Sequence, residues 1–429
     1  MIIAATTFAV LTFSVIFFPT VKIGRLKTGV YWLVALCGAT LLTAFGCAPI
    51  KEIINGLTAD TAVNPLKILA LFFSMTFLSV FLDETGFFGY LAQKAAALAK
   101  GSRFSLFVAI YALTSVLTVF TSNDVVILTL TPFICYFCKN TKIDPLPYLA
   151  GEFAAANTWS MALIIGNPTN IYLGVSAGIG FLEYLKIMIL PTVAAGITEF
   201  AIVILIFRKS LAAPLVPAVT EVKPESRADI IIGLVHLIAC LAFLVVSGYV
   251  NIEMWLVSVV CAASLFICVA VRRLFKRDGK KYLSGSLKRL PWQLIPFVVS
   301  MFVIVIYFNY CGVSEKLAAF LGEKKVLWTY GGASFIAANV INNIPMSILF
   351  SALPAGLAQS AYYRAVYATI IGSNIGAFLT PIGALAGIMF TDLTERQGVK
   401  YGFKRFLLYG VCISVPTLLA ALGVLALVI

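Results

Sequence analysis

The sequence GNPTN at residues 166–170 interrupts an apolar segment that otherwise extends from residue 148 to residue 178. Pro168 has no backbone N–H and disfavours a helical conformation at the preceding residue, while Gly166 lets the chain turn or a ligand come close. In hydrocarbon, unwound backbone is tolerated only where it lines a cavity that is enclosed by protein or filled with water. We therefore expect a broken membrane-spanning helix here, with the break facing a site.

Three other apolar segments are also interrupted by polar residues. The interruptions are SND at 122–124 in segment 105–138, INN at 341–343 in segment 327–354, and LTPIG at 379–383 in segment 361–390. In the last of these, Pro381 and Gly383 correspond to Pro168 and Gly166. Because the four interruptions occur in the same order in both halves of the chain, the sequence predicts an internal repeat.

The composition indicates that the bilayer is the solvent of this chain. Of its 429 residues, 61% are hydrophobic and 11% are charged, and the mean hydropathy is +1.01. A soluble domain carries about 25% charged residues. We expect an all-α, multi-pass protein of the plasma or inner membrane. Its apolar segments are 2–19, 30–49, 66–83, 105–138, 148–178, 184–207, 229–250, 252–271, 292–310, 327–354, 361–390 and 404–428.

The basic residues decide how segments 105–138 and 327–354 enter the membrane. As a straight helix, either would exceed the roughly 30 Å of the hydrocarbon core. If both are re-entrant hairpins, most of the 31 Lys and Arg residues lie in loops on one side, whereas two full spans would divide them almost evenly. The positive-inside rule favours hairpins and gives about ten full spans, two hairpins and two broken helices.

This topology places an odd number of crossings in each half, so the second half starts from the opposite face of the membrane. Inverted repeats are the expected result. We predict a first repeat at 1–207, a cytoplasmic linker at 208–228 and a second repeat at 229–429.

The net charge of +13 does not indicate a nucleic-acid partner, because the basic residues lie in short loops at the ends of apolar segments. The expected partners are the lipid bilayer and a small ion or oxyanion. The nine cysteines lie mostly within apolar segments, which makes disulfides unexpected.

The interruptions supply the chemistry of an ion-binding site. Broken helices direct positive N-termini and free carbonyl groups at the centre of the membrane, which suits oxygen-rich anions and small cations respectively. No cofactor is expected apart from a coupling proton or a sodium ion held by the same residues. The neutral groups expected to line the site are Asn123, Asn167, Asn170, Asn342, Asn343 and Asn374, with Gly166 and Gly383 at the breaks.

Three carboxyl groups lie within apolar segments. Asp124 at a hairpin tip has either a functional role in ion coupling or a structural role as a cap of the returning helix. Glu199 has no partner nearby in the sequence, and it is either functional or a buried, hydrogen-bonded acid. Glu152 lies one turn into its segment, where we expect it to snorkel or to cap the helix.

These motifs resemble the ion transporter superfamily. The similarity is to its branch of arsenite permeases and NhaD-type sodium/proton antiporters, which is related to citrate and dicarboxylate transporters. It covers nearly the whole chain and is most specific at FTSND 120–124, GNPTN 166–170, PWQ 291–293, NNIP 342–345 and 372–386. The resemblance implies a scaffold domain, a moving transport domain that carries hairpins and broken helices, an elevator motion and a homodimer. A partner ATPase is also compatible with it.

By this resemblance, the residues around the substrate or coupling ion are Ser122, Asn123, Asp124, Asn167, Thr169, Asn170, Asn342, Asn343, Asn374 and Thr380. Some arsenite permeases carry acidic residues where this chain has Asn157 and Asn374, and often a Pro-Lys pair where Ala377 and Phe378 stand. Asp124 is then the one carboxylate left within the four motifs.

The leading functional hypothesis is a secondary active transporter that exports an arsenite- or antimonite-type species. The alternative is a sodium-coupled di- or tricarboxylate transporter, or a sodium/proton antiporter. A membrane-embedded enzyme is disfavoured because the lone His236 and Asp124 form no nucleophile–base arrangement. A passive channel fits poorly with two discontinuous helices, which suit alternating access.

Overall fold

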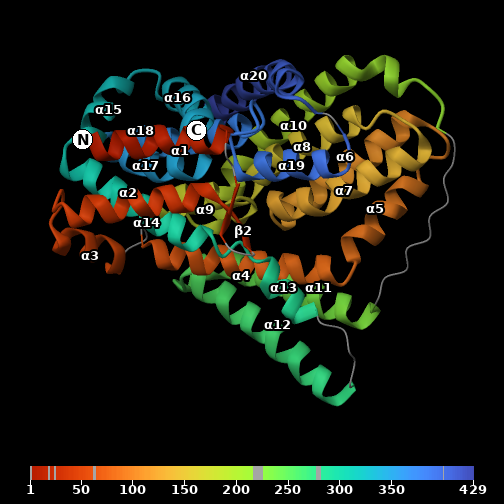
Figure 1. Ribbon diagram of the computed structural model, residues 1–429, viewed down its shortest axis with the longest axis horizontal. Coiled ribbons are helices and arrows are strands. Elements are labelled where there is room, and N and C mark those ends of the chain that lie inside the picture. The colour runs from red at the N-terminus through yellow and green to blue at the C-terminus, as the bar shows by residue number, and fades with distance from the viewer. Residues whose placement is uncertain are drawn as a thin grey trace.

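The computed structural model is almost entirely helical (Figure 1). The predicted linker 208–228 and the basic loop 272–289 are described only in part. The structure describes residues 2–17, 20–23, 26–60, 64–215, 226–276, 282–399 and 401–429.

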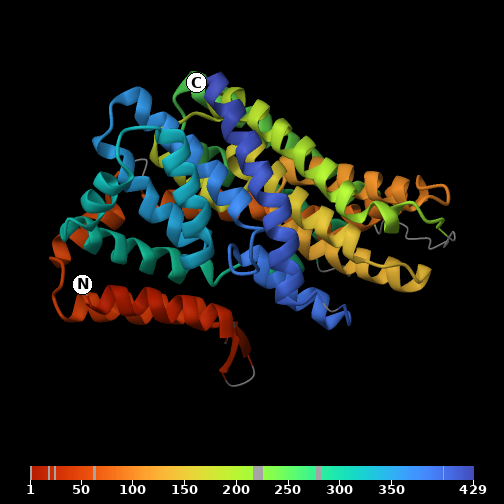
Figure 2. The same ribbon diagram turned by 90° about the horizontal axis from the view of Figure 1, so that it is seen from above.

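The N-terminal elements form an outer strip of the molecule. Helix α1 packs against α2, and between them the chain forms an antiparallel hairpin that adds two short strands to the predicted all-α fold. Figure 2 shows α1 and this hairpin along one edge. The elements are α1 (Ile2–Phe17), β1 (Thr20–Ile23), β2 (Leu26–Gly29), α2 (Val30–Ala44) and α3 (Ile50–Thr58).

The next elements contain the first pair of polar interruptions. Helix α4 starts sharply because Pro65 occupies its first position and the Asn64 side chain accepts the backbone N–H of Leu66 at 2.8 Å. The elements are α4 (Pro65–Glu84), α5 (Phe87–Ala97), α6 (Arg103–Phe120), α7 (Asn123–Thr141), α8 (Leu146–Trp159), η1 (Ser160–Ala162), η2 (Ile164–Gly166), α9 (Pro168–Ser176) and α10 (Phe181–Leu211).

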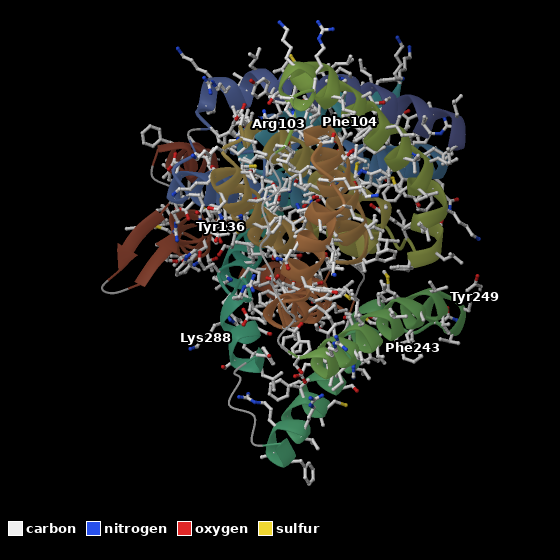
Figure 3. The ribbon with its side chains drawn as sticks, turned by 90° about the vertical axis from the view of Figure 1, so that its right-hand side faces the viewer. Arg103, Phe104, Tyr136, Phe243, Tyr249 and Lys288 are labelled. Carbon is white, nitrogen blue, oxygen red and sulfur yellow. The ribbon has the colours of Figure 1, made fainter. Side chains whose placement is uncertain are left out.

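Helices α11 (Arg227–Val250) and α12 (Met254–Lys276) pack against each other and against α4. Figure 3 shows Phe243 and Tyr249 of α11 at the outer edge of the molecule, and their exposed fractions are 56% and 72%. A helix that contacts lipid is expected to expose apolar and aromatic side chains, as α11 does.

Within the polar stretch before α14, the chain forms a further helix, α13 (Tyr282–Arg289). Arg289 ends this helix and binds two carboxylates at the end of α4, Asp83 at 2.6 Å and Glu84 at 2.9 Å. The basic stretch at 272–289 therefore forms ion pairs with the end of α4 in addition to carrying positive charge.

The remaining elements contain the second pair of interruptions. Helices α16 and α18 approach closely through small residues: a Cβ on Gly372 would clash with the carbonyl oxygen of Gly331. The elements are α14 (Leu294–Tyr310), α15 (Val313–Leu321), α16 (Val326–Ile341), α17 (Asn343–Ala352), η3 (Leu353–Gly356), α18 (Gln359–Gly376), α19 (Leu385–Arg396) and α20 (Phe403–Val428).

Both interrupted segments 105–138 and 327–354 fold back as helix pairs. In the first pair, α6 and α7 contact each other, and α5 packs against both. In the second, the Tyr330 hydroxyl of α16 donates to the carbonyl oxygen of Leu353 just beyond α17, at 3.5 Å. Each turn between the paired helices falls at the predicted polar residues.

Corresponding elements of the two halves pack reciprocally. Helix α7 of the first hairpin packs against α19, which follows the second break, and α17 of the second hairpin packs against α9, which follows the first break. The last helices of the two halves, α10 and α20, pack against each other.

Seven helices within the described ranges are long and apolar enough to cross a membrane, and two shorter apolar helices accompany them. The chain is thus an integral, multi-pass membrane protein. The number of ten full spans remains a prediction.

Candidate functional site

The first break is longer than the sequence suggests. Helix α8 ends at Trp159, two short 3₁₀ turns follow, and a new helix starts at Pro168. The Asn167 side chain caps the new helix by accepting the backbone N–H of Thr169 at 3.1 Å. A Cβ at Gly166 would overlap the carbonyl oxygen of Ser160, so glycine is required at this position.

Asn374 of α18 binds this break from the other half of the chain. Its Oδ1 accepts from the Asn167 side chain at 2.9 Å and lies 2.9 Å from the Ser160 hydroxyl. Its Nδ2 donates to Asn170 Oδ1 at 2.6 Å and to the carbonyl oxygen of Ile370 at 2.8 Å. Asn374 is fully buried; its oxygen accepts from Asn167, and both of its amide protons are donated.

The tip of the first hairpin joins the same network through α8. Asn123 Nδ2 donates to Asn157 Oδ1 at 3.2 Å, and the Ser160 hydroxyl donates to the carbonyl oxygen of Asn157 at 2.6 Å. Two buried oxygens at this tip, Ser122 Oγ and Asn123 Oδ1, have no hydrogen-bond partner within the described ranges. Buried oxygens without partners are costly, and those at the tip are available to a ligand, although similar oxygens also occur within helices, such as Thr118 Oγ1 and Ser373 Oγ.

The second break is held against the second hairpin tip. Asn342 Nδ2 donates to the carbonyl oxygen of Ile382 at 3.0 Å. The backbone N–H of Asn343 donates to the carbonyl oxygen of Gly383 at 3.1 Å. At the start of the same break, the Thr380 hydroxyl donates to Asn339 Oδ1 of α16 at 2.6 Å. Here too a buried acceptor, Asn343 Oδ1, lacks a partner in the part of the chain that the structure describes.

Asn342 has a left-handed φ of 71° with ψ of 153°, a conformation that favours glycine. We expect Asn342→Ala to lower the free energy of unfolding by about 1–3 kcal/mol, because it keeps the strain and removes the bond to Ile382. Asn342→Gly should lose less, because glycine removes the strain. Thermal melting of the purified variants checks the order, and an Ala variant as stable as the Gly variant would contradict it.

Asp124 stands apart from these networks. It is partly exposed in the first turn of α7, and no side-chain cap bond is formed at that helix start. Asp124 is therefore a carboxylate in the first turn of a helix, where the positive end of the helix dipole favours its negative charge.

The prediction that Glu152 snorkels was wrong. Its side chain is fully buried between α7 and α8, and the Thr131 hydroxyl lies 3.1 Å from each of its carboxyl oxygens. Packing of the hairpin against α8 covers a position that lies near the start of its apolar segment.

Three residues of the networks were not predicted as site residues: Asn157, Ser160 and Asn339. In the sequence, Asn157 and Ser160 precede the motif at 166–170, and Asn339 precedes the motif at 341–343. In the structure each asparagine stands within one turn of the end of its helix, but no proline or glycine in the sequence marks the end of α8 or α16.

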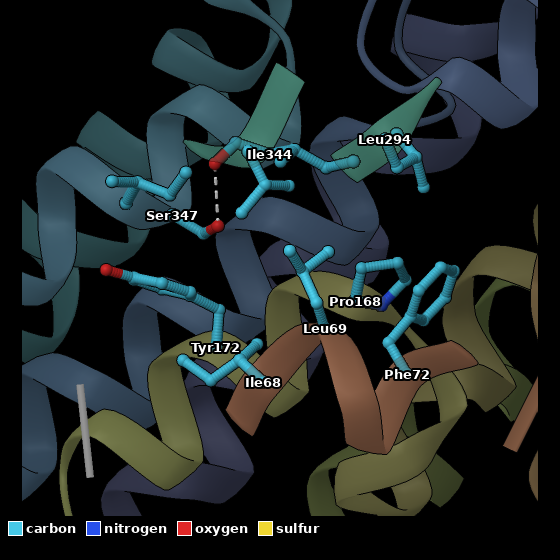
Figure 4. Close-up of a pocket in the computed structure, with 10 residues that line it drawn as sticks. Ile68, Leu69, Phe72, Pro168, Tyr172, Leu294, Ile344 and Ser347 are labelled. Carbon is cyan, nitrogen blue, oxygen red and sulfur yellow. Dashed lines mark hydrogen bonds between the residues drawn. The ribbon is translucent and has the colours of Figure 1, made fainter. Parts of the chain in front are cut away.

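Next to the first break lies an apolar pocket (Figure 4). It is bounded by Leu69 of α4, Pro168 of α9, Leu294 of α14 and Ile344 of α17, and the Ser347 hydroxyl at its edge donates to the carbonyl oxygen of Ile344 at 2.8 Å. The pocket thus lies where α4 and α14 meet α9 and α17, which adjoin a break and a hairpin tip.

Comparisons with known proteins identify the family. The family profile described as "Citrate transporter" matches residues 29–369. The arsenical pump membrane protein of Escherichia coli (strain K12) is 28% identical over 372 residues, covering 83% of this chain and 85% of that protein. A 46 kDa membrane protein of Mycobacterium leprae (strain TN) is 23% identical, covering 91% and 92%.

The fold is also that of a solved transporter. The crystal structure of the Alcanivorax borkumensis YdaH transporter, whose title reports an unusual topology, aligns with a TM-score of 0.56 at 15% identity, over 99% of this chain and 96% of that one. The predicted relation to the ion transporter superfamily is confirmed by these matches. The chain therefore belongs to the citrate transporter family of membrane ion and solute transporters.

Proposed function

We propose that this chain is a secondary active transporter that exports an arsenite- or antimonite-type oxy-species in exchange for protons. The proposal rests on one observation: the unpartnered amide groups at the hairpin tips are hydrogen-bond acceptors. Asn123 Oδ1 and Asn343 Oδ1, one at each hairpin tip, are buried acceptors that require a donor or a cation. Arsenous acid is uncharged at neutral pH and offers three O–H donors.

A carboxylate substrate fits these groups less well. Citrate and dicarboxylates are acceptors, so they need N–H groups or bound cations opposite them. The free amide oxygens of Asn123 and Asn343 at the hairpin tips can only accept, so a carboxylate would have to bind the backbone N–H groups at the starts of α7 and α17 instead. The relatives named for an arsenical pump favour the same choice of substrate.

Sodium coupling is the second candidate, because the same oxygens are suitable sodium ligands. A sodium-coupled carboxylate transporter or a sodium/proton antiporter would use the ion to neutralise the acceptors at the hairpin tips. This alternative predicts sodium-dependent transport.

We further propose that residues 1–207 and 229–429 are inverted repeats joined by a linker at 208–228. Two observations support the division. Helices α5 and α15 both begin at a left-handed glycine, Gly86 with φ of 79° and Gly312 with φ of 67°, and both precede a helical hairpin. The reciprocal packing of α7 on α19 and α17 on α9 has the symmetry that such repeats require.

An elevator motion and a homodimer complete the proposal. The apolar pocket at Leu69 and Leu294 supports a sliding seam, since few polar contacts would have to break there. The exposed apolar face of α11 and α12 is available to lipid or to a second copy of the chain. A partner ATPase would make transport depend on ATP and is tested in the same vesicles.

The proposal is tested in everted membrane vesicles with arsenite, citrate and sodium supplied separately. We expect arsenite uptake driven by a proton gradient, and growth of an arsenite-sensitive host that expresses the chain. Citrate uptake that requires sodium, without arsenite uptake, would replace the leading hypothesis by the alternative.

Asp124→Asn should uncouple transport from the driving ion, because it removes the carboxylate next to the hairpin tip. We expect uptake under a gradient to fall by roughly tenfold, equivalent to about 1.4 kcal/mol. Asp392→Asn is the matched control, since its exposed pair with Arg396 contributes little. Unchanged ion dependence in Asp124→Asn would remove Asp124 from the mechanism.

A further inference from the structure

A second buried carboxyl lies behind the first break, outside the amide networks. Glu199 of α10 has no exposed surface and lies where α10 packs against α6 and α8. The ring of Phe200 packs on Tyr111 with centroids 4.8 Å apart, which closes the α6 side of this junction with aromatic surface. A carboxyl in such a place must be neutral or strongly stabilised as an anion.

The hydrogen bonds around Tyr111 fit a neutral Glu199. Its hydroxyl oxygen lies 2.6 Å from Glu199 Oε1 and 2.7 Å from the carbonyl oxygen of Gly196, and it accepts the indole N–H of Trp159 at 3.2 Å. The carbonyl can only accept, and the hydroxyl has a single proton. If that proton goes to Gly196, the short contact with Glu199 is a hydrogen bond only when Glu199 is the donor.

Among the residues that the structure describes, no Lys, Arg or His forms an ion pair with Glu199. The side chains that face Glu199 are Tyr111 from α6 and Thr158 from α8, whose hydroxyl donates to Oε2 at 2.5 Å. Within the described ranges, α11, α20 and the 3₁₀ turns that also pack on α10 place no Lys, Arg or His against it. The proton count around Tyr111 and the absence of a counter-charge both favour a neutral, protonated Glu199.

This junction is linked directly to the site. Thr158 and Trp159 immediately precede Ser160, whose hydroxyl bridges Asn157 and Asn374. Trp159 also packs on Gly196, where a Cβ would overlap its ring. The start of the first break is therefore held by the groups that surround Glu199.

We propose that Glu199 is a proton-binding site that is protonated in this conformation and that controls the position of Ser160 in the first break. Loss of the proton would place a negative charge at a fully buried position that has no ion-pair partner within the described residues. The junction must then open or admit water, which moves Trp159 and the break that follows it. The role of this proton in coupling rests on the proposed function.

Infrared difference spectroscopy of the purified protein, without substrate, tests the protonation directly. We expect the carbonyl stretch of a protonated carboxylic acid at neutral pH in the difference between the wild-type and Glu199→Gln spectra, because other buried carboxyls such as Glu152 contribute equally to both. Glu183→Gln, which changes an exposed carboxyl on the same helix, is the matched control and should retain the band. A wild-type spectrum identical to that of Glu199→Gln in this region would overturn the proposal.

Calorimetry of arsenite binding in buffers of different ionisation enthalpy tests the coupling. We expect wild type to release about one proton more per arsenite than Glu199→Gln, with the Glu183→Gln control unchanged. Equal proton release would refute the coupling role. If arsenite does not bind to wild type, the proposed substrate fails, while the infrared band still decides whether Glu199 holds a proton.

Discussion

Asn374→Ala should abolish transport, with a loss of at least roughly 100-fold. Asn374 is the group from the second half that holds the first break, through Asn167, Asn170 and Ser160. Removal of its amide leaves buried groups on the break without partners, each costing about 1–3 kcal/mol. The break is then free to shift, and a displacement of about 1 Å at a site can cost about 100-fold in rate.

Vesicle uptake measures this loss, after the amount of folded protein in the membrane has been made equal. Asn140→Ala is the control, because Asn140 is an exposed asparagine at the end of α7. Asn374→Asp is informative as a second variant: it keeps the acceptor for Asn167 but replaces the donor to Asn170 by a second oxygen. Transport by Asn374→Ala within a factor of about two of wild type would show that the two halves do not meet at this residue.

Gly166→Ala should have the second-largest effect. The added methyl group would overlap the carbonyl oxygen of Ser160, a backbone atom that cannot move without moving the break. We expect either little folded protein or a folded variant whose uptake is reduced by roughly 100-fold. Uptake per folded molecule and thermal melting separate these two results.

Gly180→Ala provides the control for this substitution. Gly180 has a negative φ of −72° and open space around its ideal Cβ position, so alanine fits there without strain. Normal folding and normal transport by Gly166→Ala would contradict the close approach of the break to Ser160. A loss of similar size in Gly180→Ala would point to a general sensitivity of the chain to alanine.

The sequence predicted the breaks because their causes are local. Proline and glycine at 166–168 and 381–383 act through their own backbone restrictions, and the structure interrupts the helices there. The turn of each hairpin was found for a similar reason, since polar groups that interrupt an apolar segment need a buried partner. These features require no knowledge of the neighbouring helices.

The partners of the breaks could not be predicted in the same way. Asn157 and Asn339 matter because of which helix packs against them, and the sequence does not state the distance between segments far apart in the chain. Glu152 was misplaced for the same reason: its exposure depends on α7 lying over it. Local rules therefore identified where the helices break, and tertiary packing determines what the breaks bind.

The central claim is that segment 105–138 enters the membrane and returns to the same side, so that its tip reaches the first break. Thiol labelling tests this directly, with single cysteines at Lys100 and Lys139 in a background from which the nine native cysteines have been removed. Both positions are exposed and flank the hairpin. The account predicts that an impermeant reagent labels both from the same side of the membrane; labelling from opposite sides would contradict the hairpin and the site built on it.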